Sequence, residues 1–220
     1  MTPAKLKARK ARIQKLNIAL KKLYPNAAIE LSYKNPLELL VAVQLSAQST
    51  DKQVSKITEK LFKKYRTLGD YVAADPAEFE QDIFASGFYR NKAKNILGAA
   101  RMLKEEFGGK VPTTIEEILR LPGVARKTAT VVLKEAYGVV AGVTVDTHVI
   151  RFVQRYDLSD YKDAVRIERD LMQLLPKAQW GTFTHRVIHY GRYLAPARRY
   201  DTAKDPLVKI YPLAAKKFRV

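Results

Sequence analysis

The sequence predicts an all-α fold, and three observations support this prediction. Apolar residues recur at helical spacing along most of the 220 residues, and no stretch alternates polar and apolar residues for long enough to form a sheet. Asn35-Pro36 and Asp75-Pro76 each place a capping residue before a proline, as helix starts do, and Gly108-Gly109 is a typical helix end. With 47% hydrophobic residues, the chain can build one large or two small helical domains.

The first expected helix lies within the first 22 residues, which carry eight Lys and Arg and no acidic residue. This composition also suits an organelle transit peptide, but the segment contains no serine. Tyr24-Pro25-Asn26 ends the helical pattern. We therefore interpret the segment as the first helix of the mature fold, with one apolar face formed by Leu6, Ile13, Leu16, Leu20 and Leu23.

A nearly all-apolar helix is expected from Leu37 to Ala47, and polar residues that include Gln48 follow it. Thr50 or Asp51 then caps an amphipathic helix that runs to Lys64. Taken alone, Gln48 is equally well explained as a helix-end amide bonded to the backbone.

The next expected helix begins at Asp75-Pro76 and ends at Ser86-Gly87, and a long amphipathic helix is expected from Tyr89 to Phe107. Between them, Phe88 and Tyr89 lead into Arg90 and Lys92. Aromatic residues interleaved with basic ones suit a nucleic-acid surface, whereas core packing is the alternative for Phe88.

The nonapeptide Leu121-Pro122-Gly123-Val124-Ala125-Arg126-Lys127-Thr128-Ala129 connects two apolar helical patterns, Thr114 to Arg120 and Arg126 to Tyr137. Pro122 and Gly123 fit the second and third places of a type II turn, where the third residue needs a positive φ. The sequence therefore predicts a helix, a tight hairpin and a second helix. Backbone N–H groups at the start of that second helix suit one DNA phosphate.

Two residues near this hairpin carry groups that could do chemistry. Lys127 lies in the first turn of the second helix, and a lysine amine can act as a nucleophile. Asp146 follows an apolar stretch and precedes the next expected helix, so that a carboxylate stands at a helix start. Taken singly, Lys127 reads as a solvated surface lysine and Asp146 as an N-cap. The remaining expected helices run from Asp146 to Tyr156, Lys162 to Leu175 and Trp180 to Leu194.

Together, the hairpin nonapeptide and Val145-Asp146-Thr147-His148 resemble the helix-hairpin-helix DNA glycosylases, most closely the endonuclease III family. Leu45-Ser46-Ala47-Gln48-Ser49-Thr50-Asp51 and Gly87-Phe88-Tyr89-Arg90-Asn91-Lys92-Ala93 are similar to that family's two DNA-probing segments. The resemblance covers most of residues 39–193. It implies Lys127 as a covalent catalyst and Asp146 as its partner. It also implies DNA contacts by Gln48, Phe88, Tyr89, Arg90, Lys92, Gly123, Ala125, Arg126 and His148.

The resemblance further implies the family's domain arrangement. Residues 29–139 are expected to form a six-helix barrel domain with the helix-hairpin-helix, and residues 1–28 and 140–220 a second helical domain, with the active site in the cleft between them. The implied reaction is excision of damaged bases, expected to be oxidised pyrimidines, from duplex DNA, followed by β-elimination at the abasic site through a lysine Schiff base. The alternatives are a monofunctional mismatch or adenine glycosylase, which needs no catalytic lysine, and a non-catalytic DNA-binding protein.

Two features depart from the family pattern. Many endonuclease III relatives place four cysteines in the tail to hold an iron-sulfur cluster, whereas this chain has no cysteine, so we expect no cluster and no other cofactor. No metal site is expected either, because His185 and His189 have no third ligand in their motif. Ala125 stands where the family hairpin commonly carries glycine, and alanine would cost about 1 kcal/mol there if the position needed a positive φ.

Charge indicates the partner. Forty Lys and Arg against 22 Asp and Glu give a formal charge of +18, which favours a polyanion. No apolar run approaches the roughly 20 residues that span a bilayer. We expect a monomer that binds double-stranded DNA with damaged bases or abasic sites, without a membrane partner. A cytoplasmic location, with the nucleoid if the source is bacterial, is compatible with the absence of cysteine.

Overall fold

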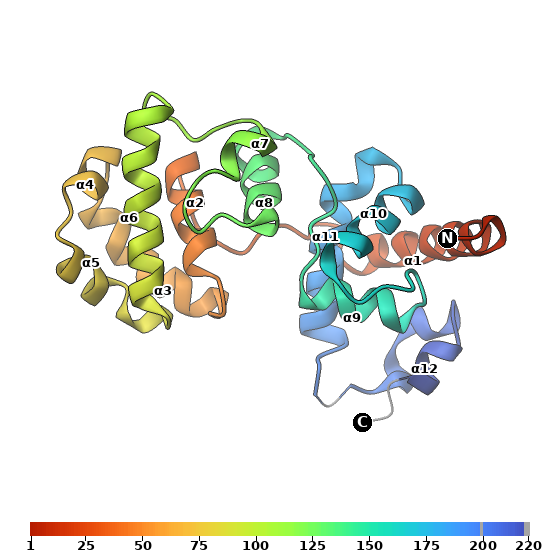
Figure 1. Ribbon diagram of the computed structural model, residues 1–220. Coiled ribbons are helices and arrows are strands. Elements are labelled where there is room, and N and C mark those ends of the chain that lie inside the picture. Colours follow the sequence, from red (N-terminus) through yellow and green to blue (C-terminus); the bar gives the residue numbers. More distant parts are fainter. Residues whose placement is uncertain (199, 218–220) are drawn as a thin grey trace. The chain divides into compact units, whose positions relative to one another are not determined.

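The computed structural model describes residues 1–198 and 200–217, and every regular element in this part of the chain is helical (Figure 1). The all-α prediction is confirmed. The chain divides into two compact units. Unit 1 comprises Met1–Ile29 and the described residues from Gly142 onward, and unit 2 comprises Glu30–Ala141. The six-helix barrel expected at residues 29–139 stays a prediction.

Unit 2 is built from seven α-helices and one 3-10 turn among its described residues. They are α2 (Pro36–Leu45), α3 (Asp51–Lys64), α4 (Leu68–Ala73), α5 (Pro76–Asp82), η1 (Phe84–Ser86), α6 (Tyr89–Glu106), α7 (Ile115–Ile118) and α8 (Arg126–Tyr137).

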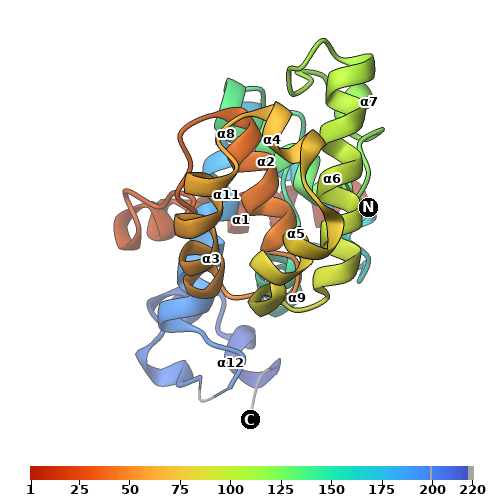
Figure 2. The ribbon, with the colours of Figure 1, turned by 90° about the vertical axis from the view of Figure 1, so that its left-hand side faces the viewer.

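The central helix of unit 2 is α2, which other helices surround in the turned view of Figure 2. Every residue of α2 from Glu38 to Leu45 is buried, as its almost wholly apolar sequence predicts. The helix begins at Asn35, whose side chain accepts a hydrogen bond from the backbone N–H of Glu38. Two long neighbours, α6 and α8, pack against α2, and α6 also runs beside α4 and α5 (Figure 1). The contacts with α6 and α8 therefore hold α2 in the interior of unit 2.

Unit 1 combines the first helix with the elements that follow residue 142. They are α1 (Pro3–Leu23), α9 (Thr147–Arg155), α10 (Ala164–Leu174), η2 (Lys177–Gln179), α11 (Trp180–His189), the π-helical turn η3 (Tyr190–Leu194), η4 (Thr202–Lys204), η5 (Pro206–Lys209) and α12 (Leu213–Lys217).

The basic first helix is part of the unit 1 core. Ile13, Leu16 and Leu20 of α1 are fully buried, and α1 packs against α10 and α11. This agrees with our interpretation of the segment as a helix of the fold. One of its basic residues, Arg9, is only 1% exposed, and its guanidinium donates to Asp160 Oδ1 at 2.7 Å and to the Asp157 carbonyl at 3.0 Å. Part of the positive charge of α1 is thus used inside unit 1.

Within residues 1–198 and 200–217, no helix is both long and apolar enough to cross a membrane.

Candidate active site

The hairpin before α8 is a tight turn that requires glycine at its third position. The Val124 N–H donates to the Leu121 carbonyl at 3.1 Å, and Gly123 has a φ of 73°. A Cβ on Gly123 would lie 2.6 Å from the Cβ of Asn95 on α6, which real contacts do not allow. The type II turn expected at Pro122 and Gly123 is therefore confirmed in its positive φ, and the close approach to α6 gives a second reason for the glycine.

The hairpin is anchored to the core of unit 2. Leu121 and Val124 are buried, and the buried side chain of Gln44 on α2 donates from Nε2 to the Pro122 carbonyl at 2.9 Å. These contacts hold the start of α8 in one place relative to α2.

Ala125 does not carry the strain that a positive φ would impose. It lies at φ −87° and ψ 170°, an extended conformation that any residue adopts, and it precedes the first residue of α8. The possible cost of about 1 kcal/mol for alanine at this position therefore does not arise. Ala125 provides no side-chain cap for α8, and the positive end of a helix favours a bound anion.

Lys127 is exposed in the first turn of α8, next to exposed Arg126. Its carbonyl accepts a hydrogen bond from Thr130 Oγ1 at 3.0 Å, and Ala129, one turn into the helix, is fully buried. The helix thus fixes the backbone of Lys127 while its side chain reaches solvent.

Gln48 and Phe88, the two predicted DNA-probing residues, share an unusual backbone. Gln48 has a φ of 55° and Phe88 a φ of 50°, a left-handed conformation that is uncommon for residues with a Cβ. Both side chains are exposed, and 64% of Phe88 is accessible to solvent. Residues with a Cβ that keep such a backbone conformation cluster at functional sites.

Lys92, which the sequence interpretation grouped with the exposed basic residues, is buried. Only 6% of it is exposed, and its Nζ donates to the Leu45 carbonyl, to Ser49 Oγ and to the Ser86 carbonyl, at 2.8, 2.9 and 2.7 Å. All three protons of the ammonium are used within the protein. Lys92 therefore joins the turn after α2 to the turn before α6.

The aromatic residues near Phe88 form an exposed patch that includes one residue the sequence did not single out. Phe84 is 58% exposed, and its ring lies 4.9 Å from that of half-buried Tyr89. The guanidinium of exposed Arg90 lies 5.4 Å from the Tyr89 ring centroid. The position of Phe84 four residues before Phe88, at the end of an expected helix, is the signal that could have identified it.

Asp146 and His148 belong to unit 1, at the start of α9. Asp146 is half-buried and caps α9, with Oδ1 accepting from the Val149 N–H at 2.9 Å. His148 is also half-buried, and its Nδ1 lies 3.3 Å from Arg151 Nη2. A Cβ on Gly191 would lie 2.4 Å from the same Nδ1, so the glycine allows His148 to pack there.

Arg151 is a second residue that the sequence did not indicate. It donates to the carbonyls of Gly191 and Ala195, each at 3.2 Å, and so fixes the end of the α11 segment against α9. Burial and the nearby Arg155 lower the pKa of Arg151, whereas the charge of Asp146 opposes this shift. Asp146 thus lies within the field of a fixed cation.

The tail contains a buried polar network. Asp205 is 2% exposed, and one of its oxygens, Oδ2, accepts from the hydroxyls of Tyr156, Tyr190 and Tyr200, with 2.9 Å from Tyr156. Arg155 donates to the Tyr190 hydroxyl at 3.2 Å and lies 3.8 Å from the Tyr200 ring centroid. In the described part of the chain, no group of three His, Asp or Glu residues could hold a metal ion.

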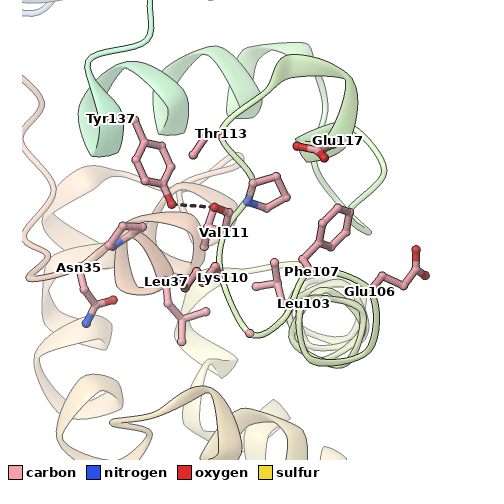
Figure 3. A pocket seen from close by; sticks show the side chains of 13 residues that line it. Asn35, Leu37, Leu103, Glu106, Phe107, Lys110, Val111, Thr113, Glu117 and Tyr137 are labelled. Carbon is pink, nitrogen blue, oxygen red and sulfur yellow. Dashed lines mark hydrogen bonds between the residues drawn. The ribbon is translucent and has the colours of Figure 1, made fainter.

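Unit 2 also contains a pocket of about 740 Å³, whose lining Figure 3 shows. Leu37 at the start of α2, Phe107 after α6 and Tyr137 at the end of α8 contribute to its lining. The Tyr137 hydroxyl donates to the Val111 carbonyl at 2.7 Å and so uses its polar group within the wall. None of the predicted site residues lines this pocket, and we assign it no role.

Comparison with known proteins identifies the family. The profile described as HhH-GPD superfamily base excision DNA repair protein matches residues 41–177. The endonuclease III of Synechocystis sp. is 48% identical over 210 residues, which cover 96% of each chain. The chain belongs to the endonuclease III family. As a member of this family, it is a DNA repair glycosylase.

Two solved structures of endonuclease III resemble the chain closely, each at 42% identity and a TM-score of 0.90. One is a non-covalent complex with DNA and covers 94% of this chain and 97% of its own. The other is a trapped covalent intermediate with DNA and covers 96% of this chain and 99% of its own. The helix-hairpin-helix glycosylase fold of the family is thereby confirmed for this chain.

Proposed function

We propose that this endonuclease III relative removes damaged bases from duplex DNA and then cleaves the strand at the abasic site, with Lys127 as the nucleophile. The observation that carries this proposal is the exposed lysine in the first turn of α8, directly after a turn that only glycine can make. A trapped covalent DNA intermediate of a protein 42% identical to this chain supports a covalent mechanism.

In the proposed reaction, the Nζ of Lys127 attacks C1′ of the deoxyribose while the bond to the damaged base breaks. The base leaves with the electron pair of that bond and takes up the proton that the attacking amine gives to Asp146. The C1′–O4′ bond then breaks, O4′ takes its electron pair and a proton from water, and the nitrogen lone pair completes the Schiff base. Removal of a C2′ proton then expels the 3′ phosphate, which nicks the strand. Asp146 accepts a proton and stabilises the positive charge that develops on the sugar.

Most of the remaining predicted residues are proposed to contact the DNA backbone or to pack on a base or a sugar. The Gly123 turn, Ala125 and Arg126 bind a phosphate at the start of α8, since a helix N-terminus and a guanidinium both favour an anion. His148 lies two residues beyond Asp146 and is proposed to contact the same strand. Tyr89 and Arg90 extend the exposed aromatic patch, on which a base or a sugar can pack.

Oxidised pyrimidines are the proposed substrates, and a panel of duplexes tests this. Base release should be fastest from duplexes with thymine glycol or dihydrouracil and slower with 8-oxoguanine or uracil, and a preformed abasic site should be cleaved. Cleavage of the abasic duplex without release of any base would contradict the glycosylase half of the proposal.

Gln48 and Phe88 are proposed to fill the space that the extruded nucleotide leaves. Replacing either with alanine should slow excision from duplex DNA by about tenfold, roughly 1.4 kcal/mol of lost extrusion energy. Cleavage at a preformed abasic site should change less, because that nucleotide has no base to unstack. Ile18→Ala is a matched control, since Ile18 is 61% exposed on α1 in unit 1. Equal losses on both substrates would indicate a folding defect instead.

We further propose that the chain holds no iron-sulfur cluster. Such clusters are bound by cysteine thiolates, and the sequence contains none. The oxygen-rich network around Asp205 does not suit a cluster either, because its carboxylate already accepts three tyrosine hydroxyls. This network is proposed to fix the tail in place of a cluster.

The proposed partner is double-stranded DNA, bound by a monomer in the cytoplasm. The formal charge of +18 supports a polyanionic partner, and the two similar endonuclease III structures contain DNA.

A further inference from the structure

We propose that Lys92 is a positioning residue for base extrusion. Its buried ammonium holds two probing loops, residues 46–50 with Gln48 and residues 84–88 with Phe88, in the conformations that present both side chains to DNA. This inference rests on the proposed function, because the loop conformations matter only if a nucleotide is extruded.

The bonds of Lys92 join the two probing loops directly. Its Nζ reaches the Leu45 carbonyl and Ser49 Oγ on one side and the Ser86 carbonyl on the other, all within 2.9 Å. Ser49 Oγ also donates to the Ser86 carbonyl. Gln48 precedes Ser49 by one residue, and Phe88 follows Ser86 by two. Each probing residue therefore lies within two residues of one that Lys92 holds.

The backbone at these loops needs such a restraint. Gln48 and Phe88 both have positive φ, and Gly87 between Ser86 and Phe88 has a φ of 67°. Residues with a Cβ keep this conformation only where the surrounding structure imposes it. Both side chains are exposed, so packing of the side chains themselves cannot supply the restraint. The three bonds of Lys92 supply it from the protein interior.

The burial of an ammonium at this point is chemically demanding. On the same face of α6, the neighbouring positions Ile96, Ala99 and Leu103 are apolar and buried. A buried cation costs free energy unless its protons are bonded. Burial lowers the pKa of Lys92 to about 8, so the amine is still mostly protonated near neutral pH and keeps three donors for its three acceptors.

The same two helices connect the probing loops with the hairpin. Asn95, one turn beyond Lys92 on α6, packs under Gly123. Gln44, which precedes Leu45 on α2, donates to the Pro122 carbonyl at 2.9 Å. The hairpin before Lys127 therefore has its own anchors on α6 and α2, and neither of them involves Lys92.

The test compares Lys92→Met with the wild-type enzyme on two duplexes, one with thymine glycol and one with a preformed abasic site. Methionine keeps most of the length of the side chain but offers no donors. We expect base excision to fall by about 10- to 100-fold, as for other small misplacements in a site. Cleavage of the abasic duplex should fall less than threefold. With the wild-type enzyme, the fluorescence of a 2-aminopurine beside the lesion should rise when the nucleotide is extruded. With Lys92→Met, this rise should be absent. The control is Lys104→Met, an exposed lysine on the same helix, which should keep wild-type rates.

Equal loss on both duplexes with a retained 2-aminopurine signal, or no loss at all, would overturn the positioning role. If Lys92→Met does not fold, Ser49→Ala decides, because it removes only the hydroxyl that bridges Lys92 and Ser86. It should lower excision selectively, and an unchanged ratio between the two duplexes would overturn the proposal. A wild-type enzyme that acts on neither duplex would instead refute the proposed function.

Discussion

Replacement of Lys127 with alanine is expected to abolish both strand cleavage and the covalent adduct that borohydride traps. Borohydride reduces a Schiff base to a stable amine, so protein remains attached to DNA only where an imine has formed. Binding to duplex DNA should stay nearly intact, because Lys127 is one of 40 basic residues. The adduct is measured by denaturing gel electrophoresis, and the affinity by titration at fixed salt concentration. Lys134→Ala, on the same helix, is the control and should still form the adduct.

Asp146→Asn gives the contrasting result within the same assay. Asparagine retains a side-chain oxygen that can accept from the Val149 N–H, so α9 should keep its cap. The lost charge should slow base release by about 10²-fold while the Lys127 adduct still forms at a preformed abasic site. Normal trapping by Lys127→Ala would mean that another amine is the nucleophile, and our assignment would then be wrong.

Local sequence signals predicted most helix boundaries. The expected helix from Arg126 to Tyr137 is α8 as observed, and the caps expected at Asn35 and Asp75 are formed. The helix expected from Trp180 to Leu194 is α11 followed by a π-helical turn. Capping signals and apolar spacing depend on residues within one or two turns, which explains their success.

The short helix α4 was not predicted, although Thr67 and Asp70 form a capping box at its start. Six residues give too short a pattern for helical periodicity to register.

The expectation that Lys92 is exposed is wrong. It rested on the basic residues near Lys92 in the sequence and disregarded the helical spacing between Lys92 and the apolar residues that follow. Lys92 lies four residues before Ile96 and seven before Ala99, on the buried face of α6. A lysine on an apolar face is the signal that could have identified the network.

The network around Asp205 could not be predicted from local pattern. Asp205 lies 49 residues from Tyr156 and 15 from Tyr190 along the chain, and these residues meet only when the tail packs on α9 and α11. The lack of cysteine predicted only that some other kind of contact holds the tail. The residues that make this contact are identified by burial and geometry alone.

Asp205→Ala is therefore expected to lower the free energy of unfolding by about 3–5 kcal/mol, because it leaves three buried tyrosine hydroxyls without their acceptor. Urea unfolding followed by circular dichroism measures the loss. Asp201→Ala is the matched control in the same segment, since Asp201 is exposed and caps a 3-10 turn. It should cost about 1 kcal/mol or less. Similar values for the two variants would contradict a structural role for the network.

The pH dependence of stability gives this network a second signature. Burial, and after it the neighbouring Asp205 and tyrosine groups, raise the pKa of Tyr156 and Tyr190 above the ordinary value of about 10. Folding thus favours the protonated hydroxyls, and the stability they contribute is complete below about pH 10 and is lost as the pH rises beyond it. An iron chelator should not change the unfolding midpoint at any pH, because the network is held by hydrogen bonds among Asp205, the three tyrosines and Arg155. A midpoint that falls on chelation would show that a metal holds the tail, and the proposed replacement of the cluster would then be wrong.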